Sequence, residues 1–182
     1  MNSLVIDMTH GGVKIAVSLA KKDETVYAYD IYNTLKSVDK KMLEVYNVKV
    51  IDLDYLNNLN GNLRVIYPVH LPLTKRDIEK YNPSLNYTFL THHEIIKELL
   101  KNWGNDIPKI EVTGVKGKTS CVFMLKEILI DKNPLILSSL GALLYENGVK
   151  KTLKQNISIT PANIKETIDL AYKIANPICE IA

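Results

Sequence analysis

The stretch IEVTGVKGKTS, residues Ile110 to Ser120, carries the pattern that decides the fold of the second half of the chain. Apolar and β-branched residues come first, and a turn with two glycines, Gly114 and Gly117, follows them. Lys118 comes directly after the turn, and apolar residues then recur at helical spacing. A strand, a glycine loop, a lysine and a helix in this order are typical of a site that cradles a nucleotide phosphate.

The loop residues have separate expected tasks. Lys118 is expected to reach the β- and γ-phosphates as the catalytic cation, and the Thr119 hydroxyl is expected to bind Mg²⁺. The general phosphate-loop pattern has a further glycine where this chain has Val112, so the pattern here is a shorter form. The alternative is an ordinary strand-to-helix turn with a solvated lysine. The residues expected to contact ATP are Gly114, Val115, Lys116, Gly117, Lys118, Thr119 and Ser120.

Composition excludes several classes of protein. The chain has 182 residues, of which 46% are hydrophobic and 24% charged, so it can bury the core of one large or two small domains. A net charge of +3 with scattered lysines does not indicate a nucleic-acid partner. No apolar run reaches membrane-spanning length, and we expect a cytoplasmic protein with no membrane partner. Cys121 and Cys179 are expected to be reduced and buried rather than paired.

Alternating elements predict a Rossmann-like α/β unit over residues 1–102. The expected strands are residues 3–7, 26–31, 48–52, 63–67 and 87–90, with a turn at 57–62. The expected helices are residues 12–22, 38–46 and 74–81, and a fourth that begins after a Thr91–Glu94 capping box. Gly11 and Gly12 are adjacent and no third glycine follows, so the dinucleotide-binding fingerprint is absent.

A helix-ending glycine and a proline in WGNDIP predict a linker at 103–108. Residues 109–182 are then expected to form an incomplete ATP-binding α/β domain with a parallel sheet. Its expected strands are 109–113, 135–137 and 177–182. The pair Asn147-Gly148 predicts a hairpin, and Thr160-Pro161 predicts the start of a helix.

Polar residues at the ends of the first two strands form a second candidate site. His10, Gly11 and Gly12 follow the first strand, and Asp30 closes the second, at the edge where open α/β sheets bind ligands. We expect these residues to contact substrate; a tight turn with an exposed histidine is the alternative. The adjacent pair His92 and His93 cannot share a ligand face on a helix, which favours capping over metal binding.

Glu180 is a lone carboxylate in an apolar strand, which is costly unless it is paired. Its partner would be Mg²⁺, and the alternative is a strand-end carboxylate that reaches solvent. Thr160 is read by default as the N-cap of its helix.

Three landmarks of the chain resemble the ATP-binding domain of the Mur ligase family: TGVKGKTS at 113–120, Ile159-Thr160-Pro161, and PICEIA at 177–182. The preceding Rossmann-like unit is similar to the family's N-terminal substrate domain. The stretches IDMTHGGVKIA, YAYDIYNT and FLTHHEIIKELL look most like an archaeal branch that acts on a nickel tetrapyrrole.

The resemblance implies a ligase that uses ATP and Mg²⁺ to phosphorylate a carboxylate, after which a nucleophile displaces phosphate. In the archaeal branch the carboxylate is a propionate of a nickel tetrapyrrole and the nucleophile is carbon, which closes the carbocyclic ring of coenzyme F-430 for methanogenesis. Carried over to this chain, Lys118 stabilises the transferring phosphoryl group. Thr119 and Glu180 hold Mg²⁺, and Thr160 lies near the substrate carboxylate.

Other functions remain open beside this one. They are a ligase that joins an amino acid to a carboxylate, a non-catalytic module that binds a nucleotide or a tetrapyrrole, and a generic phosphate-loop phosphotransferase or nicotinamide-dependent enzyme. Members of the family continue well beyond the equivalent of Ala182. We therefore expect this chain to be an N-terminal portion, catalytically incomplete without the remainder of the ligase chain.

Overall fold

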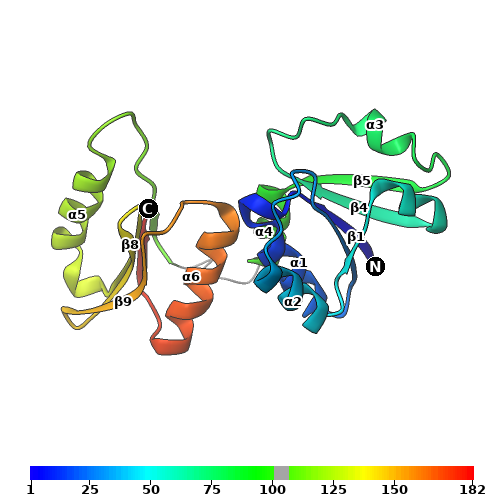
Figure 1. Ribbon diagram of the computed structural model, residues 1–182. Helices are drawn as coiled ribbons and strands as arrows, with labels where there is room; N and C mark the ends of the chain where they lie inside the picture. Colours follow the sequence, from blue (N-terminus) through cyan, green and yellow to red (C-terminus); the bar gives the residue numbers. More distant parts are fainter. Residues whose placement is uncertain (101–106) are drawn as a thin grey trace. The chain divides into compact units, whose positions relative to one another are not determined.

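The computed structural model describes residues 1–100 and 107–182, and the chain divides into two compact units, Met1–Lys101 and Asn102–Ala182 (Figure 1). Each unit has its own five-stranded sheet with helices packed on it, which confirms the α/β fold class. The linker expected at 103–108 lies mostly outside the described residues, since only 107 and 108 belong to them.

The sheet of the first unit is entirely parallel, with the strand order β3-β2-β1-β4-β5. The central strand is β1. Its residues 3–6, SLVI, are buried on both faces of the sheet, as is typical of parallel sheets. The five strands are β1 (Asn2–Ile6), β2 (Thr25–Tyr29), β3 (Lys49–Val50), β4 (Asn62–Tyr67) and β5 (Asn86–Thr91).

Three helices cover one face of this sheet, and α1 packs against the other two (Figure 1). They are α1 (Val13–Ala20), α2 (Ser37–Val45) and α4 (His92–Leu99). The expected capping box at the start of α4 is confirmed: Glu94 N donates to the Thr91 hydroxyl, and Thr91 N donates to the Glu94 carboxylate. The His-His-Glu segment therefore caps the start of α4, as expected.

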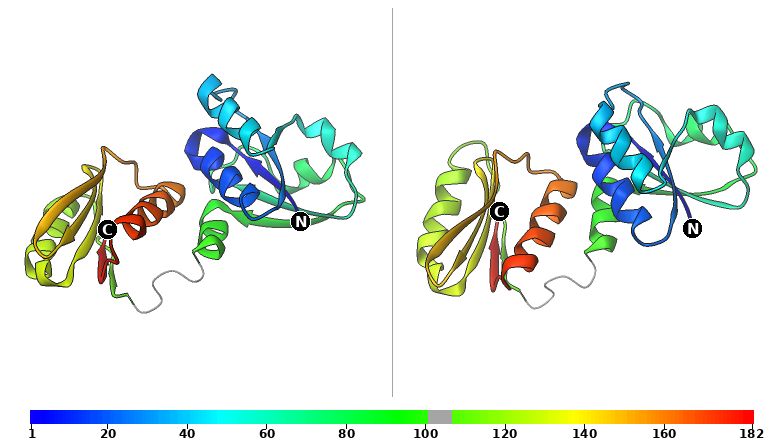
Figure 2. Two further views of the ribbon diagram at one scale, coloured as in Figure 1. Left: turned by 90° about the horizontal axis from the view of Figure 1, so that it is seen from below. Right: turned by 60° about the horizontal axis from the view of Figure 1, so that its bottom comes forward.

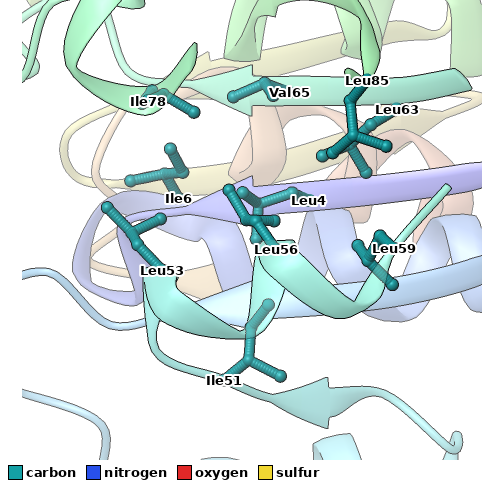
Figure 3. Close-up of a cluster of buried hydrophobic side chains, with 10 residues drawn as sticks. All are labelled: Leu4, Ile6, Ile51, Leu53, Leu56, Leu59, Leu63, Val65, Ile78 and Leu85. Atoms are coloured by element: carbon teal, nitrogen blue, oxygen red, sulfur yellow. The ribbon is translucent and has the colours of Figure 1, made fainter. Parts of the chain in front are cut away.

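A 3₁₀ helix, η2 (Leu53–Asn58), and the short helix α3 (Lys75–Glu79) cover the opposite face. Figure 3 shows Leu53 and Leu56 lying over Leu4 and Ile6 of β1. The strand expected at 48–52 is wrong in its length, because the chain leaves the sheet after Val50. Burial of these leucines favours a helical turn over the longer strand. The helix includes Asn57 and Asn58 of the turn expected at 57–62, and residues 59–61 form the irregular connection to β4.

The sheet of the second unit has the order β6-β10-β7-β8-β9 and is parallel only in its first three strands. The last two strands run antiparallel, in the hairpin that the Asn147-Gly148 pair predicts. The strands are β6 (Lys109–Ile110), β7 (Pro134–Ser138), β8 (Gly141–Glu146), β9 (Val149–Gln155) and β10 (Cys179–Ile181).

Helices α5 (Lys118–Ile128) and α6 (Pro161–Ile174) lie on opposite sides of this second sheet (Figure 2). On the α5 side, Val122 packs with Ile136 of β7 and Ile181 of β10 in a small apolar cluster. A one-turn helix, η3 (Ile130–Lys132), connects α5 to β7. In the ranges 1–100 and 107–182, no helix combines the length and the apolar composition needed to cross a membrane.

Candidate functional site

The glycine loop of the second unit connects β6 to α5. Gly114 and Gly117 both have positive φ, 144° and 79°, so the loop takes a path that favours glycine at each position. Lys118 is the first residue of α5, and its ammonium group donates to the carbonyl oxygen of Gly114. The lysine side chain is therefore directed back over the loop, on the side where the helix begins.

The start of α5 has no side-chain cap, because its N-cap residue is Gly117. The first amide groups of a helix have no partner within the helix and carry the positive end of its dipole. Val115, Lys116 and Ser120 are exposed, and Thr119 is half-buried in the first turn. A glycine loop, an uncapped helix start and a lysine together form a surface suited to phosphate oxygens.

Glu180 lies in β10, opposite Lys109 of β6 in the parallel register. It is 8% exposed, and its Oε2 is the one buried side-chain polar atom of the described residues with no hydrogen-bond partner. Burial raises the pKa of Glu180 to about 7; the nearby Lys109 opposes this rise and Glu111 adds to it. A buried carboxylate oxygen without a partner fits the donor set that Mg²⁺ prefers.

The two residues predicted to hold Mg²⁺ come from elements that contact each other, α5 and β10. Side chains alternate along a strand, however, and Ile181 packs on the α5 side. Glu180 therefore projects toward the opposite side of the sheet, and Thr119 is not brought beside it. Residues 1–100 and 107–182 hold no group of three or more His, Cys, Asp or Glu side chains that could bind a metal by itself.

Thr160 is the N-cap of α6: its hydroxyl accepts from Asn163 N at 3.4 Å, and Pro161 occupies the first helical position. Its structural role is thus the capping that the sequence pattern indicates. Both cysteines are free; Cys179 is buried as expected, whereas Cys121 is exposed. The exposure of Cys121 corrects the expectation that it is buried, because it follows the loop on the outer side of α5.

In the first unit, His10, Gly11 and Gly12 lie in the turn η1 (Met8–Gly12), at the carboxyl end of β1, where the backbone angles of His10 and Gly11 are not helical. The His10 Nδ1 lies 2.6 Å from Oδ2 of Asp7, a fully buried carboxylate. Oδ1 of the same carboxylate accepts from Thr9 N at 2.8 Å. Asp7 is the functional candidate that the pattern analysis missed; its only signal is a carboxylate between a buried strand and a His-Gly-Gly turn.

Asp30 follows β2 and holds the loop after it. Its carboxylate accepts from Leu35 N at 2.6 Å and from the Thr34 hydroxyl at 3.4 Å. The Thr34 hydroxyl is also hydrogen-bonded to that of Thr9, which joins this loop to the turn that carries His10. Asp30 also lines an open pocket of about 330 Å³ at the carboxyl ends of β2 and β3. The structure therefore places His10 and Asp30 along one edge of the sheet.

No family model matches the chain. It is 32% identical over 174 residues to "Coenzyme F(430) synthetase" of Methanosarcina acetivorans, an alignment that covers 88% of this chain and 34% of the relative. It is 29% identical over 137 residues to the protein of the same name from Methanocaldococcus jannaschii, covering 71% of this chain and 31% of that one. The resemblance to this archaeal branch is confirmed, and the chain spans about a third of the length of the curated relatives it matches.

Two ligases among the solved structures align with almost the whole chain. One is UDP-N-acetylmuramate:L-alanyl-gamma-D-glutamyl-meso-diaminopimelate ligase from Neisseria meningitides, with a TM-score of 0.43 and 15% identity over 99% of this chain and 51% of that one. The other is a murein peptide ligase from Psychrobacter arcticus, with a TM-score of 0.45 and 14% identity over 100% of this chain and 37% of that one.

Proposed function

We propose that this chain is the nucleotide-binding and substrate-binding portion of an ATP-dependent ligase of the Mur ligase type. Residues 1–102 serve as the substrate domain, residues 109–182 form part of the ATP-binding domain, and 103–108 link them. The complete ligase transfers the γ-phosphoryl group of ATP to a substrate carboxylate, and a nucleophile then displaces phosphate from the acyl phosphate. The small-molecule substrate and the remainder of the ligase chain are its partners.

The observation that carries the proposal is the loop between β6 and α5. This short segment brings together three features: two glycines with positive φ, an uncapped helix start and the Lys118 ammonium group. Phosphoryl transfer needs little from a protein beyond positioning and stabilisation of negative charge. In the proposed complex Lys118 leaves the Gly114 carbonyl and contacts the transferring phosphoryl group.

Mg²⁺ would be held by the Thr119 hydroxyl and by Glu180. Its chemistry when bound is to neutralise the charge that develops on the phosphate oxygens. The unpartnered Oε2 of Glu180 supports this assignment, since a buried carboxylate without a cation is costly. Glu180 projects away from α5, so of the two proposed ligands it is Thr119 that lies at the phosphate loop in this structure.

On the substrate side, we assign the acceptor carboxylate to a propionate of a nickel tetrapyrrole and the reaction to closure of the carbocyclic ring of coenzyme F-430. The names of the two curated relatives support this assignment. His10, Gly11 and Gly12 would contact the substrate directly, and Asp30 would act by holding the neighbouring loop. Thr160 would lie near the carboxylate that is activated.

The test of the proposal compares Lys118→Ala with Lys150→Ala, which removes an exposed lysine of β9 outside the loop. Loss of a hydrogen bond to a charged group costs roughly 1.5–3 kcal/mol, or roughly tenfold to 150-fold in affinity. We expect K118A to weaken binding of MgATP and of magnesium triphosphate by that factor, measured by calorimetry, and K150A to match the wild type. Equal binding by all three proteins would overturn the assignment of the loop.

A further inference from the structure

The topology of the first unit places β1 at the point where the chain reverses direction across the sheet. From β1 the chain moves outward through β2 and β3, and it then returns to β4 on the other side of β1. At such a point the connections after β1 and after β4 leave in opposite directions, which opens a crevice at the carboxyl ends of the strands. The turn with Asp7 and His10 lies at this position, directly after β1.

The hydrogen bond between Asp7 and His10 fixes which nitrogen of the imidazole carries a proton. A carboxylate only accepts, so the Nδ1 that lies 2.6 Å from Asp7 Oδ2 must be the donor. In the neutral imidazole the lone pair is then on Nε2. The side chain of His10 is 65% exposed and that of Asp7 is fully buried, so the free nitrogen belongs to the solvent-exposed end of the pair.

The backbone around Asp7 is built to hold this pair. Asp7 has a φ of 71°, a left-handed conformation that is unusual for a residue other than glycine, and its N–H donates to the Tyr29 carbonyl oxygen at 3.0 Å. A Cβ atom on Gly12 would lie 2.0 Å from the Asp7 carbonyl oxygen, so only glycine permits this close approach. An unfavourable conformation held by the surrounding structure is a feature of functional sites.

The groups around His10 belong to a site that faces solvent, not to the core. The ring of Tyr32, itself 42% exposed, makes an edge-to-face contact with the imidazole at 6.3 Å between centroids. Behind the turn, the buried His92 donates from Nε2 to the Ile6 carbonyl oxygen at 3.2 Å. Burial lowers the pKa of His92, so this second imidazole is held neutral beside Asp7. His10 is thus the imidazole of this group that a substrate can reach.

We propose that Asp7 is a positioning residue that presents Nε2 of His10 as the proton acceptor of the substrate site. The inference rests on the proposed ligase function. When the nucleophile of the substrate attacks the acyl phosphate, the lone pair of Nε2 takes its proton. The electron pair of the broken X–H bond forms the new bond to the acyl carbon. The bond from that carbon to the phosphate oxygen breaks, and inorganic phosphate, derived from ATP, leaves.

A purely structural role for the pair makes a different prediction. In that case Asp7 stabilises the turn, and the state of Nε2 has no consequence for ligand binding. Two measurements distinguish these roles. One determines the tautomer of the His10 ring, and the other determines whether a substrate-like probe protects that ring from a reagent.

The first experiment is ¹⁵N NMR of the histidine rings at a pH where all four histidines are neutral. His10 is assigned from the signal that His10→Gln removes, and His93→Gln serves as the matched control because His93 is exposed. We expect His10 to be a single tautomer with its proton on Nδ1 in the wild type, and to become a mixture of tautomers in Asp7→Asn. A proton on Nε2 in the wild type, or an unchanged ring spectrum in D7N, would overturn the proposal.

The second experiment measures acylation of each histidine by diethylpyrocarbonate, with mass spectrometry as the readout. The reagent attacks the unprotonated ring nitrogen, so exposed His70 and His93 are internal references. We expect His10 to react faster than both references in the wild type and to fall to their rate in D7N. Uroporphyrin, a tetrapyrrole polycarboxylate used as the probe, is expected to slow acylation of His10 alone. Unprotected His10 in a chain that binds uroporphyrin would overturn its placement in the substrate site.

Failure of the proposed function can be distinguished from failure of this inference. If the loop is not the nucleotide site, the wild type and K118A bind MgATP equally. The NMR spectrum of the His10 ring does not depend on that result. A chain that leaves the absorption spectrum of uroporphyrin unchanged contradicts the tetrapyrrole substrate, whereas the tautomer of His10 in D7N still decides the role of Asp7.

Discussion

Asp7 and Glu180 are both buried carboxylates, with 0% and 8% of their surface exposed. Asp7 has two donors, the Thr9 N–H and the His10 imidazole, within 2.8 Å. Glu180 has an oxygen with no partner, and burial raises its pKa to about 7. Removing the carboxylate therefore has opposite effects on stability at the two positions. At Asp7 it costs two hydrogen bonds, whereas at Glu180 it removes a charge that is unfavourable in a buried position.

We predict that Glu180→Gln stabilises the chain above neutral pH. The folded-state pKa of Glu180 is about 7 against an ordinary value of 4.5, so the unfolded chain ionises first as the pH rises. The stability contributed by the protonated form is present below pH 4.5 and is lost by about pH 7, a change of roughly 3 kcal/mol. In thermal unfolding, the stability lost between pH 5 and pH 8 should be smaller for E180Q than for the wild type.

The matched control for this experiment is Glu44→Gln, which changes an exposed glutamate of α2. E44Q should follow the wild type at both pH values. The account of Glu180 is contradicted if E180Q and the wild type lose the same stability between pH 5 and pH 8. Addition of Mg²⁺ to the wild type at pH 8 should recover part of the difference, because a bound cation removes the cost of the buried charge.

At the level of single elements, the turn between β1 and α1 tolerates no Cβ atom at Gly12. We predict that Gly12→Ala destabilises the first unit by more than about 2 kcal/mol, because the new atom would lie 2.0 Å from the Asp7 carbonyl oxygen. Gly61→Ala is the comparison: Gly61 has a φ of 81°, but a Cβ atom added there would meet no other atom within 4 Å, so only about 1 kcal/mol is expected. Denaturant unfolding of both variants measures the difference, and equal losses would contradict it.

Arg64 connects three elements from one position in β4. Its guanidinium donates to Ser3 of β1, to Glu98 of α4 at 3.2 Å and to Glu24 at 2.5 Å, with a side chain only 10% exposed. We predict that Arg64→Met destabilises the first unit by roughly 3 kcal/mol, because it removes the cation beside the largely buried Glu24 carboxylate, which keeps its hydrogen bond from the Ser3 hydroxyl.

The control for Arg64 is Lys80→Met, which breaks an exposed ion pair with Asp77 and should change stability little. The double variant R64M with Glu24→Gln should recover part of the loss, measured by chemical denaturation. If R64M costs the same stability in the wild-type background and in the Glu24→Gln background, Arg64 acts through packing alone.

Local sequence patterns predicted a helix or strand well where one of its faces is buried and where residues typical of caps or turns stand at its ends. The Thr91–Glu94 capping box, the Asn147-Gly148 hairpin and the helix after Thr160-Pro161 are all present. The helix at Leu53–Asn58 was not predicted, because its leucines are buried against β1, a segment far away along the chain. The partnership of Asp7 with His10 was missed for a related reason, since it depends on a left-handed φ at Asp7 that no residue pattern predicts.

At the scale of the whole molecule, each unit has its own sheet and its own apolar cluster. Because the first sheet and its two covering layers lie within residues 1–100, we predict that residues 1–102 fold by themselves with a cooperative thermal transition. The same fragment should retain the single Nδ1–H tautomer of His10. A fragment without a cooperative transition would contradict the independence of the first unit.

The function proposed for the loop between β6 and α5 is to bind nucleotide phosphate. The most direct measurement is calorimetric titration of ATP into the 182-residue chain with and without Mg²⁺. We predict saturable binding that depends on Mg²⁺ and is competed by magnesium triphosphate. Absence of binding to the wild type under both conditions, with the chain folded by circular dichroism, would contradict the claim.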